Sequence, residues 1–331
     1  MTGNTFSTTR REVFKLAGGA AAAAAFGGGL VQSAKAAAPM LGVSRPSIYR
    51  FKVGAFEVTN ILDGYVQGNG PHPTYGNNQT PEAVQAYAQS QGLNPTRMES
   101  IYVNTLVNTG KELVLFDAGN GKARIPTAGK LPELLVTAGY KPEQVDIVVI
   151  THGHPDHIGG LMEGEGGKPT YPNARYIFGE AEFDYWKKGE GISEARKPTK
   201  FQFDKIMAPL ADKCTFLKGG DDVVSGIRAV DCSGHSAGLT GFQIESGGRS
   251  VVLFADSFLH YVCGIQRPDW TIGFDDDQQK AVANRKKMLA MLSAEKMMAI
   301  GFHMPFPSVG WIDKMADGTH RWVAASYQMN V

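Results

Sequence analysis

The sequence contains few cysteines and has almost no excess of charge of either sign. Its 331 residues include three cysteines, Cys214, Cys232 and Cys263, with no CxxC spacing. An odd number without such spacing argues against a disulfide framework, so we expect three buried free thiols. With 33 basic and 32 acidic residues interspersed, the net charge is +1. This balance provides no electrostatic footprint for nucleic acid or an anionic membrane, and we expect a small neutral or weakly charged substrate as the partner.

The first 38 residues resemble a twin-arginine export signal. Arg10 and Arg11 precede a weakly apolar Ala/Gly stretch, which ends at a small-residue site, Ala34 to Ala36. This order is typical of an export signal, with cleavage expected between residues 36 and 38. The stretch is too short and too rich in glycine for a spanning helix, so no stable membrane anchor is expected. We therefore predict a periplasmic or secreted protein whose remaining residues, 39–331, form one domain.

Strand and helix patterns are mixed along these remaining residues. Strands are predicted within residues 49–66, 104–117, 145–150, 226–230, 240–256 and 296–303, and helices within 131–138, 180–188 and 281–294. The charged stretch that leads to Lys205 is predicted to be an exposed segment or lid. Hairpins combined with helices favour an α/β or α+β fold over a purely parallel sheet.

Four potential metal ligands follow the apolar run VDIVVI, in the stretch THGHPDHIGG at residues 151–160. His152 and His154 alternate and can face one divalent ion, whereas Asp156 and His157 can face a second one beside it. Imidazole and carboxylate ligands suit Zn²⁺ and tolerate Mn²⁺, Fe²⁺ or Co²⁺. The stretch therefore predicts part of a metal site.

Three more polar residues stand where an apolar run opens into a loop. These are His235 after GIRAVDCSG, Asp256 after SVVLFA, and His303 after MMAIGF. One histidine in such a place would more often be an ordinary hydrogen-bonded residue. Five of the eight histidines at such positions, together with two aspartates, favour a metal site, and more specifically a site for two ions.

The other three histidines carry weaker signals. His72 lies in a Pro-rich loop and His320 in a Gly/Asp turn, so both are expected to be solvated. His260 is predicted to line the pocket or to orient a metal ligand from behind.

Several aromatic and charged residues have two interpretations. Phe183, Tyr185, Trp186 and Phe306 could form an apolar pocket beside the metals or could pack in the core. Trp270 is expected to anchor its loop to the core. Near it, Asp275 or Asp277 is expected to cap the next helix or to form an ion pair with Arg285.

The order of these motifs resembles the metallo-β-lactamase superfamily. HxHxDH is followed by a Ser-Gly-His turn, an Asp after a strand and a late His after a strand. The likeness covers nearly the whole chain after the signal. It is greatest to the methyl parathion hydrolase-like branch, adjacent to the N-acyl homoserine lactonases, in the segments VNTGKELVLFDAG, AGYKPEQVDIVVITHGHPDHIGGLMEG, FDDDQQKAVANRKKML and FHMPFPSVG. The resemblance implies a four-layer αββα sandwich with metals at one edge between the sheets.

The resemblance also implies a ligand set and a reaction. One ion would be held by His152, His154 and His235, the other by Asp156, His157 and His303, with Asp256 bridging. Two divalent ions, zinc being the expected metal, would share a hydroxide that attacks an ester, lactone or phosphotriester of a small, partly apolar substrate. Asp156 or Asp256 would receive the proton, which makes these two the predicted catalytic residues. Asp117 is implied to support the metal loop without binding a metal.

The chain departs from the family pattern in two places. Leu239, in SGHSAGLTG, replaces the second histidine of a frequent His-Thr-Pro-Gly-His motif, which changes the surroundings of the metal site but not its ligands. Ser257 and Phe258 follow the bridging aspartate where some lactonases have a tyrosine, so a tyrosine-assisted mechanism is not expected.

Two other functions and the oligomeric state stay open. A β-lactamase is disfavoured because that branch uses a Cys ligand. An exported metal-binding protein without catalysis is disfavoured by the apparently intact ligand set. A homodimer is left open by the sequence.

Overall fold

The computed structural model describes residues 38–164 and 167–325. Every helix and strand described below lies in one compact unit, Arg45–Val331, whereas the described residues before it have no helix or strand. The predicted export signal lies outside the described residues, apart from its last position. No helix in the described ranges combines the length and the apolar character needed to cross a bilayer.

The first half of the unit forms a seven-stranded sheet with its strands in chain order. The strands are β1 (Ile48–Val53), β2 (Phe56–Asn69), β3 (Arg97–Asn108), β4 (Leu113–Phe116), β5 (Ile147–Ile150), β6 (Arg175–Gly179) and β7 (Cys214–Leu217). β1 to β4 pair antiparallel and β4 to β7 pair parallel. The predicted hairpin turn at Gly54 is confirmed, since it joins β1 to β2.

The second half forms another seven-stranded sheet, ordered from β14 to β8. Its strands are β8 (Asp222–Val224), β9 (Ile227–Asp231), β10 (Thr240–Ser246), β11 (Arg249–Leu253), β12 (Met298–Ile300), β13 (Val309–Lys314) and β14 (His320–Ala324). Only β11 and β12 among them pair parallel, because α7 connects the two.

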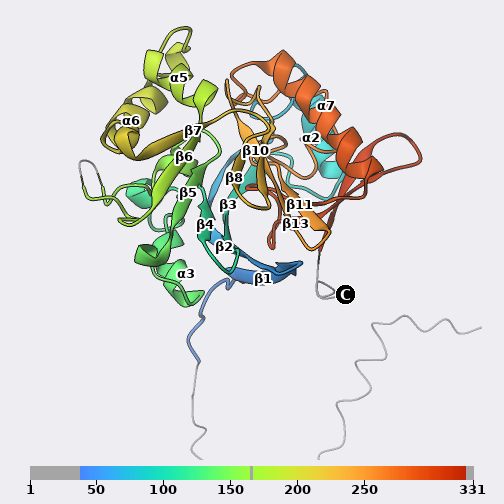
Figure 1. Cartoon of the computed structure of the whole chain (residues 1–331). Helices are drawn as coiled ribbons and strands as arrows, with labels where there is room; N and C mark the ends of the chain where they lie inside the picture. The colour runs from blue at the N-terminus through green and yellow to red at the C-terminus, as the bar shows by residue number, and fades with distance from the viewer. Residues whose placement is uncertain (1–37, 165–166, 326–331) are drawn as a thin grey trace, which may run out of the picture. The chain divides into compact units, whose positions relative to one another are not determined.

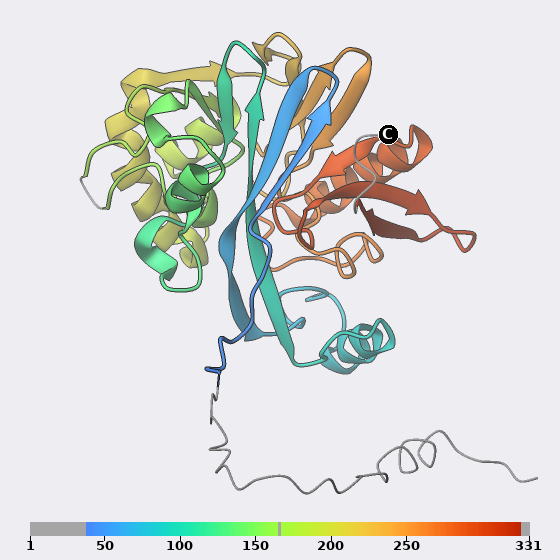
Figure 2. The same cartoon turned by 90° about the horizontal axis from the view of Figure 1, so that it is seen from below.

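Helices cover the outer faces of both sheets (Figure 1). The α-helices are α2 (Pro81–Ser90), α3 (Leu131–Thr137), α4 (Pro155–Ile158), α5 (Glu180–Lys188), α6 (Lys197–Met207) and α7 (Gln278–Ala294). Short 3₁₀ turns are η1 (Gly121–Arg124), η2 (Pro142–Gln144), η3 (Glu194–Arg196) and η4 (Ala208–Lys213). In Figure 1 α3, α5 and α6 lie outside the first sheet and α7 outside the second, and Figure 2 shows the same order of layers from below. The predicted αββα sandwich is confirmed.

The core has a main part between the sheets and a second part under the outer helices. Phe116 of β4 meets Phe242 of β10 across the sheets, with ring centroids 5.1 Å apart. Phe178 of β6 packs against Phe183 of α5 at 5.9 Å in the second part. The strands therefore bury apolar residues on both faces, against the other sheet on one side and against the outer helices on the other, as a sandwich with helices outside requires.

Several local predictions were wrong or incomplete. The stretch up to Lys205 is largely exposed, as expected, but it is not a free lid, because it contains most of α6, which buries Thr199 and Phe203 within that stretch. Cys214 is half-buried rather than buried, while the other two cysteines are buried free thiols as expected. His72 and His320 are only partly exposed.

Other predictions around α7 are confirmed. Trp270 is 2% exposed and packs in a cluster with Tyr75. Asp277 caps α7, which begins three residues before the predicted start, and Asp275 pairs with Arg285 (2.8 Å).

Candidate metal centre

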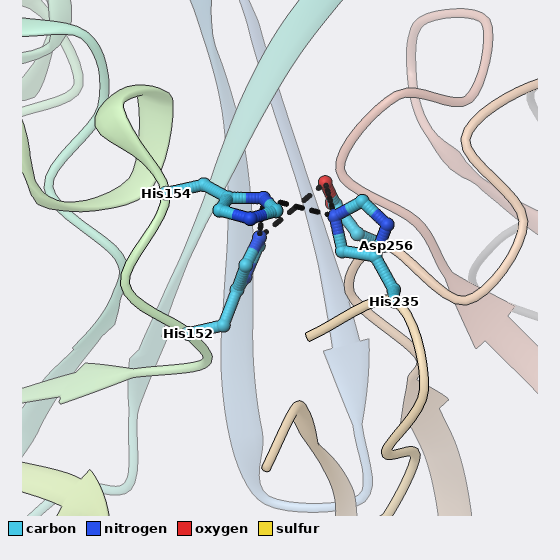
Figure 3. Close-up of side chains that lie close together, drawn as sticks. All are labelled: His152, His154, His235 and Asp256. Carbon is cyan, nitrogen blue, oxygen red and sulfur yellow. Dashed lines mark hydrogen bonds and ion pairs between the residues drawn. The ribbon is translucent and has the colours of Figure 1, made fainter. Parts of the chain in front are cut away.

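The predicted ligands come together at one end of the two sheets. His152 follows β5 closely, His235 lies between β9 and β10, and Asp256 and His303 follow β11 and β12. Two groups of polar atoms result, each within 4.8 Å: His152, His154, His235 and Asp256 in the first, and Asp156, His157, Asp256 and His303 in the second. In Figure 3 the first group converges from opposite sides, two histidines from one loop facing His235 and Asp256.

Asp256 is common to both groups, and its Oδ2 atom lies among the ring nitrogens of four histidines. The distances from Oδ2 are 3.1 Å to Nε2 of His303, 3.3 Å to His157, 3.4 Å to His235 and 3.7 Å to His152. One carboxylate oxygen thus faces nitrogen donors of both groups.

Acceptors behind the ligands orient three of the imidazoles. Each ring donates from Nδ1: His157 to Asp117 (2.8 Å), His235 to Asp275 (2.9 Å) and His303 to the backbone carbonyl of Ile101 (2.8 Å). A carboxylate or a carbonyl can only accept, so the hydrogen of a neutral ring lies on Nδ1 and the Nε2 lone pair faces the centre.

These lone pairs fit a divalent cation. Nδ1 of His154 lies 2.9 Å from Nε2 of His152 and 3.0 Å from Nε2 of His235, so three nitrogens meet at one point. Nε2 of His157 and Oδ1 of Asp256 are buried and have no hydrogen-bond partner within the described residues. Imidazole nitrogens and carboxylate oxygens in this arrangement are the donors that Zn²⁺ takes.

The charges of the protein also favour a cation here. Burial lowers the pKa of His157, but the carboxylates of Asp256 and Asp117 outweigh burial and hold the pKa well above its ordinary value. Burial raises the pKa of Asp256, yet His303 and His157 hold it well below its usual range. The negative potential that favours a proton on His157 also attracts a metal ion.

The other two histidines of the first motif are favoured in the neutral form. Burial, followed by the neighbouring histidines, holds the pKa of His152 well below its ordinary value, and burial and His235 do the same for His154. A neutral imidazole is the form that binds a metal.

Close packing explains the glycines of the motif loop. A Cβ at Gly153 would lie 2.6 Å from the indole of Trp186, and one at Gly160 would lie 2.0 Å from the carbonyl of Ala118. Asp117 holds the start of the same loop, since it accepts from both the N–H (2.8 Å) and the hydroxyl (2.9 Å) of Thr151. The loop is thus fixed from both sides.

Glu182 of α5 links the two loops that carry the first group, and sequence reasoning missed it. This fully buried carboxylate accepts from the N–H of Gly153 (2.9 Å), the indole of Trp186 (2.6 Å), the hydroxyl of Ser236 (2.9 Å) and the N–H of Gly238 (2.7 Å). In the sequence it appears only as an acidic residue in the first turn of a helix, where acids are common.

A cavity of about 400 Å³ opens beside both groups. Val66, Met98, Leu259 and Phe274 supply apolar walls, and Tyr102, Arg124 and Arg196 supply polar ones. The four aromatic residues that were expected either to form a wall of this cavity or to pack in the core do not line it. Phe183 and Trp186 are core residues, and Tyr185 and Phe306 line other cavities.

His260 also lies outside this cavity. Its Nδ1 accepts from the N–H groups of Val262 and Cys263, both at 3.1 Å, and the residue lines a neighbouring cavity. It therefore neither lines the cavity beside the metal groups nor holds a ligand by a hydrogen bond.

Comparison with known proteins identifies the family. The model of the metallo-beta-lactamase superfamily matches residues 101–299, and the chain belongs to this superfamily. A mouse (Mus musculus) protein, metallo-beta-lactamase domain-containing protein 1, is 35% identical over 112 residues. That match covers 33% of this chain and only 41% of the mouse protein.

Solved structures with the same fold include hydrolases. AidC, a dizinc quorum-quenching lactonase solved with a product, is 25% identical with a TM-score of 0.79, covering 85% of this chain and 98% of AidC. The hydrolase AbOPH is 24% identical with a TM-score of 0.77, and the match covers 86% of this chain and 100% of AbOPH. A probable metal-dependent hydrolase from Staphylococcus aureus is 19% identical with a TM-score of 0.68, and the match covers 83% of this chain and 99% of that protein. The chain is thus a metallo-β-lactamase superfamily hydrolase with His/Asp groups that could hold metal.

Proposed function

We propose that the protein is a dinuclear, zinc-dependent hydrolase of a carboxylic ester or lactone. The observation that carries this proposal is the position of Asp256, whose Oδ2 lies 3.1–3.7 Å from four histidine nitrogens that belong to two groups. A single ion would not need a carboxylate shared between two sets of donors.

The assigned ligands divide as the geometry does. His152, His154 and His235 would hold one ion, Asp156, His157 and His303 would hold the other, and Asp256, which belongs to both groups, would serve both. Bound ions would supply hydroxide near neutral pH and would polarise the oxygen of the substrate. Asp156 lines the cavity with 15% of its side chain exposed, against 2% for Asp256, so we assign to it the uptake of the proton after attack.

The walls of the cavity support a substrate with an apolar part. Val66, Met98 and Leu259 offer a surface that an alkyl or acyl chain can cover. The similarity to AidC, whose structure contains the product N-hexanoyl-L-homoserine, favours a lactone or ester over a phosphotriester.

An activity panel tests this function. Metal-loaded protein would be assayed on N-hexanoyl-L-homoserine lactone, 4-nitrophenyl hexanoate, a dimethyl aryl phosphotriester and a penicillin. We expect the lactone or the carboxylic ester to give the highest kcat/KM. Hydrolysis of the penicillin alone would favour the β-lactamase alternative. Two bound ions without turnover of any of the four would favour a metal-binding protein that lacks catalysis.

A further inference from the structure

Two arginines line the cavity beside the metal groups, and they differ in whether a carboxylate of the described residues forms an ion pair with them. Nε of Arg196 lies 2.8 Å from Oδ1 of Asp276, and the same side chain donates to the backbone carbonyl of Phe274. Arg124 forms no ion pair with a carboxylate within residues 38–164 and 167–325. Arg124 therefore brings a positive charge to the cavity that no neighbouring acid pairs with directly.

The guanidinium of Arg124 is held at one nitrogen and free at the others. Nη1 donates to the hydroxyl of Tyr102 and to Oδ1 of Asn120 (3.0 Å), and the guanidinium carbon lies 5.1 Å from the centroid of the Tyr102 ring. Nε and Nη2, which carry three N–H groups, have no protein acceptor among the described residues. The planar group is thus oriented in advance, with donors left for a ligand.

The turn that carries Arg124 is itself held in place by a buried carboxylate. Asp63, which is fully buried, accepts from the N–H (3.0 Å) and side-chain amide (2.8 Å) of Asn120, and from the N–H groups of Gly129 (3.1 Å) and Leu131 (2.8 Å). These contacts close η1 and the loop after it around one carboxylate. The position of Arg124 is therefore set by the fold and is not that of a free surface side chain.

We propose that Arg124 binds a carboxylate of the substrate, so that the ester or lactone hydrolysed here is a partly apolar molecule with a negative charge. This substrate class rests on the proposed hydrolase function, whereas the carboxylate subsite does not. A guanidinium with free donors matches a carboxylate in a bidentate manner. The apolar part of the molecule covers Val66, Met98 and Leu259 of the same cavity. The expectation of a neutral or weakly charged substrate changes accordingly.

A matched pair of esters tests the substrate class. 4-Nitrophenyl hexanoate and mono-4-nitrophenyl adipate have acyl chains of equal length, and only the second carries a carboxylate. Wild-type protein is expected to prefer the adipate ester, and Arg124→Met is expected to lower kcat/KM for it about tenfold to hundredfold while sparing the hexanoate ester. Arg124→Lys should retain part of the preference. Arg97→Met is the control, since Arg97 is exposed on β3 outside the cavity and its loss removes the same charge.

A binding measurement separates the subsite from the proposed hydrolysis. Adipic acid monoamide and hexanamide, which are not esters, are titrated calorimetrically into metal-loaded wild-type, Arg124→Met and Arg97→Met proteins. We expect only Arg124→Met to weaken binding of the monoamide, with hexanamide unaffected. If neither ester is turned over but this pattern holds, the hydrolase proposal fails and the subsite stands. Equal affinity of wild type and Arg124→Met for the monoamide, or no binding by wild type, overturns the subsite.

Discussion

The polar atoms of the metal centre depend on buried partners that are not ligands themselves. Asp275 shows this most clearly, because it accepts from His235 (2.9 Å) and from Arg285 (2.8 Å), and all three side chains are at most 2% exposed. Such a partner both fixes the tautomer of a ligand and balances a buried cation.

Replacing Asp275 by asparagine should therefore lower both stability and metal affinity. The change leaves the Arg285 guanidinium buried without an opposing charge, so we expect a loss of about 3 kcal/mol in the free energy of unfolding. Urea denaturation of the metal-free protein would measure it. Asp313→Asn is the control, because its partner Arg321 is 54% exposed and that ion pair is solvated. Equal stability of the two variants would contradict the role of Asp275.

His260 supplies a pH dependence that can be isolated by mutation. Burial lowers its pKa to about 4 from 6.5, and the two N–H groups that donate to Nδ1 require the neutral ring. Because the pKa of His260 is lower in the folded protein than in the unfolded chain, the stability that its neutral ring contributes is complete above pH 6.5. This contribution is lost as the pH falls toward 4. Between pH 7 and pH 5 the wild type should lose about 2 kcal/mol more than His260→Gln in urea unfolding. An identical pH dependence of both proteins would refute this assignment.

At the scale of elements, α5 is the part of the fold that joins the metal loops. Glu182 receives four hydrogen bonds from Gly153, Trp186, Ser236 and Gly238. Burial raises its pKa, but every partner is a donor, so the site requires the carboxylate and a glutamine would turn an N–H toward these donors.

Glu182→Gln should thus loosen both loops while α5 keeps its own packing. We expect metal affinity to fall by about tenfold to hundredfold, measured by competition with a chromogenic chelator. Glu180→Gln is the control, because Glu180 is the first residue of the same helix and its side chain is half-exposed. This variant should leave the metal affinity unchanged. A general loss of stability without a change in metal affinity would count against the positioning role.

Elements that bury one clear face could be predicted from the sequence, and the others could not. β1, β2, α3, α5 and α7 follow strong alternation or helical spacing, and the structure has them within a few residues of the expected bounds. β13 and β14 were not predicted, because their pattern becomes clear only when the sheet edge is known. α6 was not predicted as a helix, because its many charges conceal the few apolar residues that it buries.

At the scale of the whole molecule, the resemblance carried by the HxHxDH stretch and the later His and Asp residues implied the fold, and the structure brings the distant strand ends that carry these residues together. The pocket could not be predicted in the same way. Its walls include residues of β2, β3, η1 and the loop after β11, and no local pattern shows that Tyr102, Arg124 and Leu259 line the same cavity. The buried carboxylates that hold the loops in place, such as Glu182 and Asp63, could not be predicted either, since a buried carboxylate and a surface one look alike in a sequence.

The export signal is a separate prediction at this scale. Arg10 and Arg11 support twin-arginine export, and replacing both by lysine should leave the chain in the cytoplasm of a bacterial host that has this pathway. Cell fractionation followed by immunoblotting would measure the distribution. Unchanged export of the double variant would contradict the prediction.

The metal content of the loaded protein tests the central claim most directly. Elemental analysis after zinc loading and removal of free metal should find about two ions per chain in the wild type, because Asp256 serves two groups of donors. His157→Ala removes a donor from the second group alone and should retain about one ion, with most hydrolytic activity lost. A single ion in the wild type, or two ions and near-normal activity in His157→Ala, would contradict the dinuclear account.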